Sequence, residues 1–240
     1  MQLAGKVAMI SGGGVGLGAA LARRFSEEGA AVSICGRRQK PLESVGVELA
    51  DRGASLVARA ADVRDAESVE AWFAATREAL GPIDVFVNNA SILGDREAIA
   101  TYDSDVWREV LEVNLTGAFQ CARAAIPYLK ETRGALINVS SGVGDHGRPM
   151  WGAYCVSKNG LEALSEILAG ELEEDRVRVN IVDPGGMRTA MRADAYPEED
   201  PMTLPTPYEI SDVFVYLASD RSAGVTGHRF RAREFEVAVR

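Results

Sequence analysis

The chain has 240 residues, of which 47% are hydrophobic and 25% charged, and these are ordinary values for a globular protein with one sizeable core. Its formal net charge of −9 argues against a general nucleic-acid surface, because such a surface needs clustered positive charge. No apolar run approaches the roughly 20 residues of a membrane-spanning helix, and no signal peptide opens the chain. We therefore expect a cytoplasmic protein with no nucleic-acid or membrane partner.

A strand, a glycine-rich turn and a helix form the first predicted unit. The apolar run at residues 7–10 ends in glycines, as a buried strand does, and residues 16–29 have the apolar spacing of a helix. Gly12, Gly16 and Gly18 allow a tight turn and close approach of a phosphate to backbone N–H groups, and the helix dipole favours the same anion. A glycine-rich turn can be only a flexible loop, but its place between a strand and a helix favours cofactor binding.

Two arginines, Arg37 and Arg38, follow the second predicted strand at residues 31–35. In dinucleotide-binding folds an acid at this strand end binds the adenosine ribose, whereas an arginine accommodates a 2′-phosphate. No acid stands here, and guanidinium groups form forked, charge-assisted hydrogen bonds to phosphate. We therefore expect NADP(H), held first by Arg37 and second by Arg38. Two alternatives stay open: the arginines are solvated surface charges, and the cofactor is NAD(H).

Strands and helices alternate along the rest of the chain. Further strands are predicted at residues 56–58, 83–87, 135–139 and 177–182, and further helices at residues 39–52, 66–80, 104–131, 150–171 and 208–218. This alternation predicts a doubly wound, Rossmann-type α/β fold with about seven parallel strands and helices on both faces. We expect one NAD(P)-binding domain over residues 1–240.

The end of the chain carries a strand-like segment rich in arginine. His228, Phe230 and Ala232 alternate with arginines, and the apolar phase shifts at Phe235, which indicates a bulge or bend. We interpret these arginines as one solvated strand face. Contact with a neighbouring subunit and contact with an acidic substrate are the alternatives.

The three cysteines, Cys35, Cys121 and Cys155, fall in separate predicted elements. They show neither metal-ligand spacing nor a paired framework, so we expect buried free thiols and no metal site. Such thiols suit a reducing cytoplasm.

The helix predicted at residues 150–171 carries Tyr154 and Lys158 one turn apart, so both project from one face. A tyrosine normally titrates at about pH 10, and an ammonium held close favours the phenolate and lowers the pKa. The pair therefore suits acid/base chemistry, although a Tyr-x-x-x-Lys pair alone is common on solvated helices. Ser141 follows the strand at residues 135–139, at the end of the sheet where open α/β proteins bind ligands.

These features occur with further motifs in a fixed order. They are the glycine turn at residues 11–18, Asn88-Asn89-Ala90, Asn114, Ser141, Tyr154 with Lys158, and Pro184-Gly185. The chain resembles the short-chain dehydrogenases/reductases over about residues 3–227. The segment around residues 184–201 is similar to a little-characterised bacterial subgroup of these oxidoreductases. Together the motifs are specific for fold and cofactor class and much less specific for substrate.

The resemblance implies the residues of the site. As catalytic residues it implies Asn114, Ser141, Tyr154 and Lys158. To Arg37 and Arg38 it adds, as cofactor-binding residues, Tyr154, Lys158, Ser11, Gly12, Gly14, Gly16, Leu17, Gly18, Asp62, Val63, Asn89, Ala90, Pro184, Gly185, Gly186 and Thr189. Two positions depart from the family's pattern. Val15 stands where many NADP-preferring relatives carry a basic residue, and Ser91 replaces the usual glycine.

The family's chemistry implies an oxidoreductase that interconverts a carbonyl and an alcohol by hydride transfer. Tyr154 gives the proton, and Ser141 binds the carbonyl oxygen. Lys158 lowers the pKa of the tyrosine and binds the ribose, and Asn114 holds a water that links the lysine to solvent. Residues 187–207 are expected to cover the small-molecule substrate. By the same resemblance, the helices that hold Asn114 and Tyr154 form a homotetramer or homodimer.

Two functional alternatives stay open beside this reading. One is an NAD-dependent alcohol dehydrogenase of the same family, and the other is a non-catalytic dinucleotide-binding regulator. The substrate also stays open among 3-oxoacyl thioesters, steroids, sugars and small ketones, because loops of unknown shape build the pocket.

Overall fold

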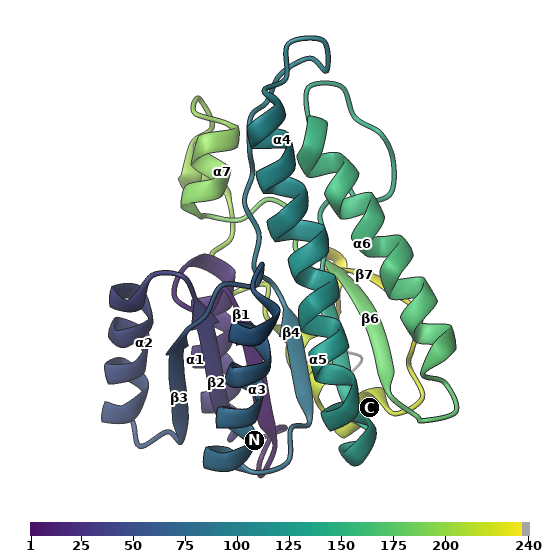
Figure 1. Cartoon of the computed structure of the whole chain (residues 1–240). Helices are drawn as coiled ribbons and strands as arrows, with labels where there is room; N and C mark the ends of the chain where they lie inside the picture. The colour runs from purple at the N-terminus through teal and green to yellow at the C-terminus, as the bar shows by residue number, and fades with distance from the viewer. Residues whose placement is uncertain (237–240) are drawn as a thin grey trace.

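A seven-stranded parallel sheet forms the centre of the molecule (Figure 1). The computed structural model describes residues 1–236. The strands are β1 Val7–Ser11, β2 Ala31–Gly36, β3 Leu56–Ala60, β4 Val85–Asn88, β5 Ala135–Val139, β6 Arg178–Asp183 and β7 Arg229–Arg231. They lie in the order β3-β2-β1-β4-β5-β6-β7, and every neighbouring pair is parallel. This confirms the predicted Rossmann-type sheet, whose strand order reverses between β1 and β4, the place where such folds bind ligands.

Helices cover both faces of the sheet. They are α1 Gly16–Glu27, α2 Gln39–Asp51, α3 Ala66–Leu80, α4 Ser104–Leu111, α5 Gly117–Thr132, α6 Gly152–Glu171, α7 Ala190–Ala195 and α8 Asp212–Ala218. In Figure 1, α3, the α4–α5 helix and α6 lie in front of the sheet, and α7 stands above the carboxyl ends of the strands. The apolar residues of α1, α2 and α8 pack on the opposite face.

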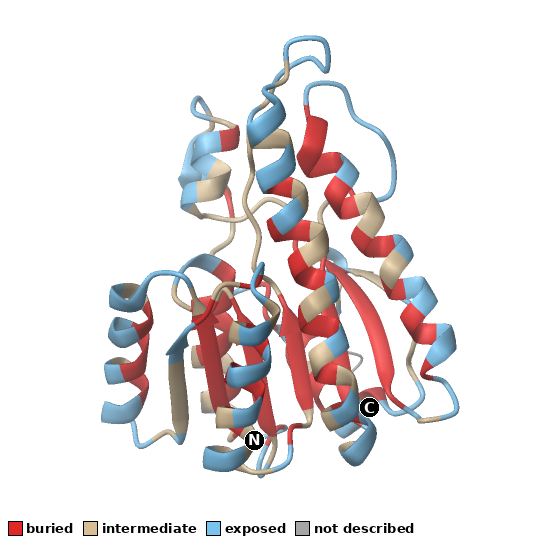
Figure 2. Ribbon diagram, in the orientation of Figure 1, coloured by how far each residue is buried: buried red, intermediate tan, exposed pale blue. Residues whose placement is uncertain are grey.

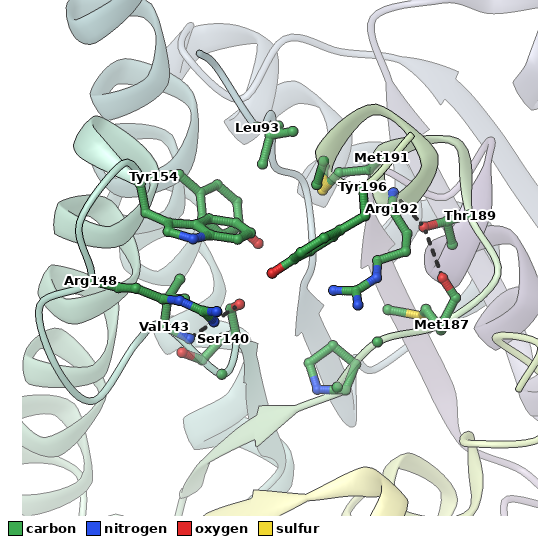
Figure 3. Close-up of a pocket in the computed structure, with 17 residues that line it drawn as sticks. Leu93, Ser140, Val143, Arg148, Tyr154, Met187, Thr189, Met191, Arg192 and Tyr196 are labelled. Carbon is green, nitrogen blue, oxygen red and sulfur yellow. Dashed lines mark hydrogen bonds between the residues drawn. The ribbon is translucent and has the colours of Figure 1, made fainter. Parts of the chain in front are cut away.

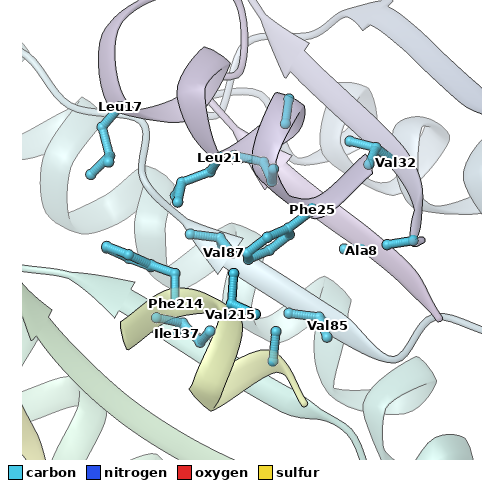
Figure 4. Close-up of a cluster of buried hydrophobic side chains, with 14 of the residues drawn as sticks. Ala8, Leu17, Leu21, Phe25, Val32, Val85, Val87, Ile137, Phe214 and Val215 are labelled. Carbon is cyan, nitrogen blue, oxygen red and sulfur yellow. The ribbon is translucent and has the colours of Figure 1, made fainter. Parts of the chain in front are cut away.

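The central strands β1, β4 and β5 are buried along their whole length because helices cover both faces of the sheet. Figure 2 shows the central strands buried throughout. In β1, Ala8 and Ile10 join the cluster beneath α1 and α8, part of which Figure 4 draws. The alternate residues Val7 and Met9 join the second cluster, beneath α3 and α5. This period of two follows from the pleat of a strand.

The helix predicted at residues 104–131 is interrupted by a π turn at Glu112–Thr116. Asn114 lies in this turn and is buried. Its side-chain oxygen accepts a hydrogen bond from the backbone N–H of Ile92 (2.8 Å), and its amide donates to the carbonyl oxygen of Ile92 (2.8 Å). The π turn, a device frequent at functional sites, therefore fastens the segment that follows β4 to the helix.

The structure corrects the prediction in the last quarter of the chain. The helix predicted at residues 208–218 begins only at Asp212, and the proline-rich segment contains α7 and the 3₁₀ turn Pro201–Thr203. After β7 the chain turns at Ala232–Glu234, which confirms the predicted bend before Phe235. The rest of the predicted phase shift lies outside the described residues.

Two further expectations concern buried thiols and helix length. Cys35, Cys121 and Cys155 are buried and free, as predicted. Within residues 1–236, no helix has both the length and the apolar character needed to cross a membrane.

Candidate active site

The glycine turn after β1 is bound tightly to the end of β4. The Ser11 hydroxyl accepts hydrogen bonds from the backbone N–H groups of Asn89 (2.9 Å) and Ala90 (3.0 Å), and the Asn89 amide donates to the Ser11 carbonyl oxygen (2.8 Å). A Cβ on Gly18 would lie 2.3 Å from the carbonyl oxygen of Gly12. Gly12 itself has a φ of 67°, a conformation that favours glycine. Ser11 and Gly18 thus fix the shape of the turn, while Gly12, Gly14 and Gly16 line the groove.

A groove follows the carboxyl ends of β1, β2 and β4 in two compartments. The first, of about 510 Å³, is lined among others by Gly12, Gly14, Arg37, Arg38, Asp62, Val63 and Ala90. The second, of about 230 Å³, is lined among others by Gly12, Gly16, Leu17, Asn89, Ala90, Tyr154, Lys158, Pro184 and Thr189. Gly12 and Ala90 line both, so the compartments meet at the glycine turn. Arginines at one end, backbone N–H groups at the centre and a Tyr–Lys pair at the other end fit the shape and charge of a dinucleotide.

The arginine end of the groove is open to solvent. The side chain of Arg37 is 45% exposed and lies 3.6 Å from Glu109, while Arg38 stands at the first turn of α2. Asp62 is bound by the guanidinium of Arg64 at 2.6 Å, whose hydrogen bonds hold the pKa of that carboxyl below its usual value. Asp62 is therefore held in place at the groove wall, and Arg37 keeps donors available.

Tyr154 and Lys158 lie buried where the second compartment ends, with exposed fractions of 8% and 2%. The lysine Nζ donates to the carbonyl oxygen of Val139 (2.8 Å) and stands 5.7 Å from the centre of the tyrosine ring. Burial raises the pKa of Tyr154, and the hydroxyls of Ser141 and Ser91 oppose this shift. Burial also lowers the pKa of Lys158 to about 8.

The direction in which the pKa of Tyr154 is shifted corrects an expectation. The sequence predicted that the lysine ammonium would lower the pKa of Tyr154, but the pKa is raised, because loss of hydration penalises the phenolate most and Asp183 adds to that penalty. Lys158 directs its ammonium to a backbone carbonyl instead of the phenol.

The two serines after β5 differ in what they contact. Ser140 is buried and its hydroxyl donates a short hydrogen bond to Glu162. The Ser141 hydroxyl lies beside the phenol of Tyr154 and lines an adjoining pocket. The Ser140 hydroxyl is therefore occupied by Glu162, whereas the Ser141 hydroxyl can still donate a hydrogen bond into the pocket. Ser91, the departure noted in the sequence, lines the groove with its hydroxyl buried and without a hydrogen-bond partner among the described residues.

Arg229 of β7 supports the site from beneath, and the prediction of a solvated arginine face is wrong for this residue. Its side chain is only 20% exposed and donates to Glu162 (3.0 Å), Asp183 (3.3 Å) and the carbonyl oxygen of Ser141 (3.0 Å). The two carboxylates are buried and need a cation close by. Arg231, two residues on, points outward with 56% of its side chain exposed.

A third pocket opens beside Tyr154 and Ser141 (Figure 3). It has a cavity volume of about 170 Å³ and includes Gly185 and Gly186, two of the predicted cofactor residues. Its lining includes four large side chains that the sequence did not mark as site residues: Arg148, Trp151, Arg192 and Tyr196. Arg148 and Trp151 come from the loop before α6, Arg192 from α7 and Tyr196 from its C-cap, and none of them belongs to a motif. For Arg192 and Tyr196 the only signal in the sequence was the prediction that residues 187–207 cover the substrate.

An open parallel sheet with this glycine turn and groove defines a dinucleotide-binding α/β protein of the oxidoreductase type. The model of the short chain dehydrogenase family matches residues 6–200, and the chain belongs to this family of oxidoreductases, whose members use NAD(P). This confirms the resemblance noted in the sequence.

Two related proteins and one solved structure are similar to this chain over nearly its whole length. The uncharacterized oxidoreductase YciK of Escherichia coli is 34% identical over 232 residues, covering 95% of this chain and 92% of that protein. The 3alpha-hydroxysteroid dehydrogenase of Mediterraneibacter gnavus is 36% identical over 239 residues, covering 95% of both. The crystal structure of a short chain dehydrogenase of Shigella flexneri, complexed with NADP, superposes with a TM-score of 0.93 at 32% identity and covers 97% of this chain and 98% of that one.

Proposed function

We propose that the protein is an NADP(H)-dependent oxidoreductase that interconverts a carbonyl and an alcohol, with Tyr154 as the acid/base. The observation that carries this proposal is the position of Tyr154 and Lys158. Both are buried at one end of the groove that suits a dinucleotide, and Ser141 lies beside the phenol. Burial of ionisable groups costs free energy, and buried ionisable groups in a cleft are characteristic of catalytic sites. Such a set of groups argues against the alternative of a non-catalytic regulator.

The cofactor proposal rests on the arginine end of the groove. Arg37 and Arg38 line it, and no carboxylate follows β2 directly in the sequence. Within residues 1–236, the one ion pair of Arg37 is that with Glu109, which is long at 3.6 Å. We therefore assign the 2′-phosphate to Arg37 first and Arg38 second, and the pyrophosphate to the turn at Gly12–Gly18. The NADP bound to the Shigella flexneri relative supports this assignment. When bound, the nicotinamide cofactor supplies or accepts the hydride.

The proton chemistry follows from the pKa directions. Because burial raises the pKa of Tyr154, the phenol stays protonated at neutral pH and is ready to donate its proton to a carbonyl oxygen. Ser141 donates a hydrogen bond to that oxygen as negative charge grows on it. Lys158 then stabilises the phenolate that remains and binds the ribose hydroxyls. Asn114, which fastens Ile92, is assigned the water that connects this lysine to solvent.

Three further assignments belong to the proposal. The chain acts as one domain, in which residues 187–207, with α7 against the pocket, cover the substrate. The helices that hold Asn114 and Tyr154 form a homo-oligomer, and exposed Phe119 of α5 and Val156 and Ile167 of α6 supply apolar surface for it. The free thiols suit a reducing cytoplasm.

A Tyr154→Phe variant tests the proposed catalytic role. It should bind NADPH with unchanged affinity and lose carbonyl reduction by about 100-fold or more, because the proton donor is gone. The matched control is Tyr208→Phe, which removes an exposed hydroxyl that pairs with Glu27. Near-normal turnover in Tyr154→Phe would refute the role.

Parallel titrations with NADPH and NADH, followed by cofactor fluorescence, test the cofactor. We expect NADPH to bind at least about tenfold more tightly, and Arg37→Met to remove most of that difference. Arg77→Met, which breaks a surface pair with Glu131 far from the groove, should leave it unchanged. Equal affinity for both cofactors would favour the NAD-dependent alternative.

A further inference from the structure

The pocket beside Tyr154 is positively charged although the protein as a whole is acidic. Among the described residues that line it are two arginines, Arg148 and Arg192, and no aspartate or glutamate. The chain carries a formal net charge of −9, so this local excess of cations runs against the composition. A cleft lined by one sign of charge concentrates ligands of the opposite sign.

Arg192 is held rigidly from three sides. Its Nε and Nη2 donate to the two carboxylate oxygens of Glu199 (2.6 and 2.7 Å), and its guanidinium lies 3.8 Å from the centre of the Tyr196 ring. On the third side a Cβ on Gly186 would stand 3.3 Å from the guanidinium carbon, so the backbone there fits against the group. Nη1 makes no hydrogen bond to any residue from 1 to 236. A fixed guanidinium with one free nitrogen thus faces the pocket, ready to bind an oxyanion.

Arg148 approaches the same cavity from the other wall. Figure 3 shows the two guanidinium groups reaching into the pocket from opposite sides. Arg148 lies over the ring of Trp151 at 5.6 Å, and no ion pair involves it within the described chain. It therefore carries a full charge that the protein leaves uncompensated at the mouth of the pocket.

Arg96 adds a third cation behind the aromatic wall. Its guanidinium lies between Trp151 (4.7 Å) and Tyr196 (4.8 Å) and donates to the carbonyl oxygen of Ala195. Of the three arginines around these two rings, only Arg192 has a carboxylate partner within residues 1–236. The faces of the two aromatic rings attract these guanidinium groups but do not neutralise their positive charge.

We propose that the pocket selects a small carbonyl or alcohol substrate that carries a carboxylate, bound by Arg192 and Arg148. The proposal rests on the function proposed above and adds the substrate class to it. A cavity of about 170 Å³ favours a short acid over an extended apolar molecule such as a steroid. The carboxylate lies between the two arginines, and the reacting carbon lies beside Tyr154 and Ser141, which share this pocket.

The test compares short oxo acids with their methyl esters, which keep the carbonyl and remove the charge. Pyruvate, acetoacetate and levulinate, each against its ester, place the carboxylate at increasing distance from the carbonyl. With NADPH as reductant, we expect kcat/KM to favour the acid by at least about tenfold in one pair, as for one charge-assisted hydrogen bond. Arg192→Met and Arg148→Met should lower that ratio toward one by raising KM for the acid and not for the ester.

Glu199→Gln is the matched control. It removes the carboxylate that offsets Arg192 and keeps the cation, so the preference for the acid should persist or grow. If Arg192→Met fails to fold, this variant and Arg148→Met still decide the question. Equal use of acid and ester, or a ratio unchanged in both arginine variants, would overturn the proposal and leave the Tyr154 chemistry standing.

A binding measurement separates failure of this proposal from failure of the proposed function. Calorimetry of the same three oxo acids with NADP-loaded protein reports binding even where none of the compounds is reduced. Binding of an acid that weakens at least about tenfold in Arg192→Met supports the carboxylate site. Absence of binding, or a loss of NADP affinity in Arg192→Met with acid binding unchanged, would overturn it.

Discussion

The two halves of the site are built in different ways. The proposed cofactor half, around β1 and β4, is lined mainly by small residues and backbone groups, such as those of the turn at Gly12–Gly18. The substrate half, around β5 to β7 and α7, depends on arginines that join residues far apart, as Arg229 does with Glu162, 67 positions away. The turn offers a phosphate backbone groups, which do not depend on the side chains, whereas the pocket offers arginines and aromatic rings, which a single substitution can remove. The comparison implies that substrate choice can change by substitution in the pocket while the cofactor half stays the same.

The largest expected effect comes from a substitution in the substrate half. Arg229→Met leaves Glu162 and Asp183 buried without their cation, so the free energy of unfolding should fall by about 2–4 kcal/mol. Urea unfolding followed by circular dichroism measures it. The control is Arg231→Met on the same strand, where the exposed side chain should cost less than about 0.5 kcal/mol. A loss in Arg229→Met as small as that expected for Arg231→Met would show that Arg229 acts as a surface residue.

The second-largest effect comes from a substitution that alters the cofactor half alone. Gly18→Ala forces a Cβ to within 2.3 Å of the Gly12 carbonyl oxygen, so the turn must open. We expect NADPH affinity to fall by about tenfold to hundredfold, the equivalent of about 1–3 kcal/mol of overpacking. Gly170→Ala in α6 has no atom within 4 Å of the new Cβ and should bind NADPH normally. Unchanged affinity in Gly18→Ala would mean that the turn tolerates the shift.

The third effect concerns Lys158, which stands where the two halves meet. Its pKa of about 8 means that the ammonium is present below this pH and is lost as the pH rises through it. Without the ammonium the phenolate of Tyr154 loses its stabilising charge, so the rate of reduction should fall by up to about tenfold per pH unit above that value. Initial rates between pH 6 and 10 give the profile. A flat profile, or the same fall in Lys158→Met, would exclude Lys158 as its origin.

The smallest expected effect comes from removing the hydroxyl of Ser91. Its buried hydroxyl lies beside the phenol of Tyr154, and Ser91→Gly restores the residue usual in the family. This hydroxyl opposes the rise in the pKa of Tyr154 and so stabilises the phenolate that forms in the reaction, an effect of about 0.5–1.5 kcal/mol for one neutral group. Without it, kcat should fall by about twofold to tenfold while NADPH affinity is unchanged. A Ser91→Ala variant should resemble the glycine variant, because both lack the hydroxyl. An unchanged kcat in both would show that this hydroxyl plays no part.

The sequence predicted the fold and the cofactor half because both depend on local patterns. Alternating apolar strands and helices revealed the parallel sheet, and the glycine turn and Asn88-Asn89-Ala90 marked the ends of β1 and β4. Asp65 caps α3 in the same local way, because its side chain accepts hydrogen bonds from the backbone N–H groups of Glu67 and Ser68. Each of these signals lies within a few residues of the feature that it predicts.

The substrate half could not be predicted in this way. Arg148, Arg192 and Tyr196 meet only because α7 folds over the carboxyl end of the sheet. The prediction of a solvated face fails for Arg229 because its partners come from α6 and β6, and the alternation of residues along β7 does not reveal them. The raised pKa of Tyr154 also follows from burial in the finished fold, which a Tyr-x-x-x-Lys spacing does not contain.

The contacts of Arg229 have a consequence for the order of folding. β7 is the last strand of the described chain, and its arginine contacts Ser141, Asp183 and Glu162 across separations of 88, 46 and 67 residues. None of these contacts can form before β7 has joined β6 at the edge of the sheet. The sheet from β3 to β6 can therefore assemble while the loop of Ser141 remains loose. We expect the enzyme to become active in a final slow step, later than the appearance of its helices and strands.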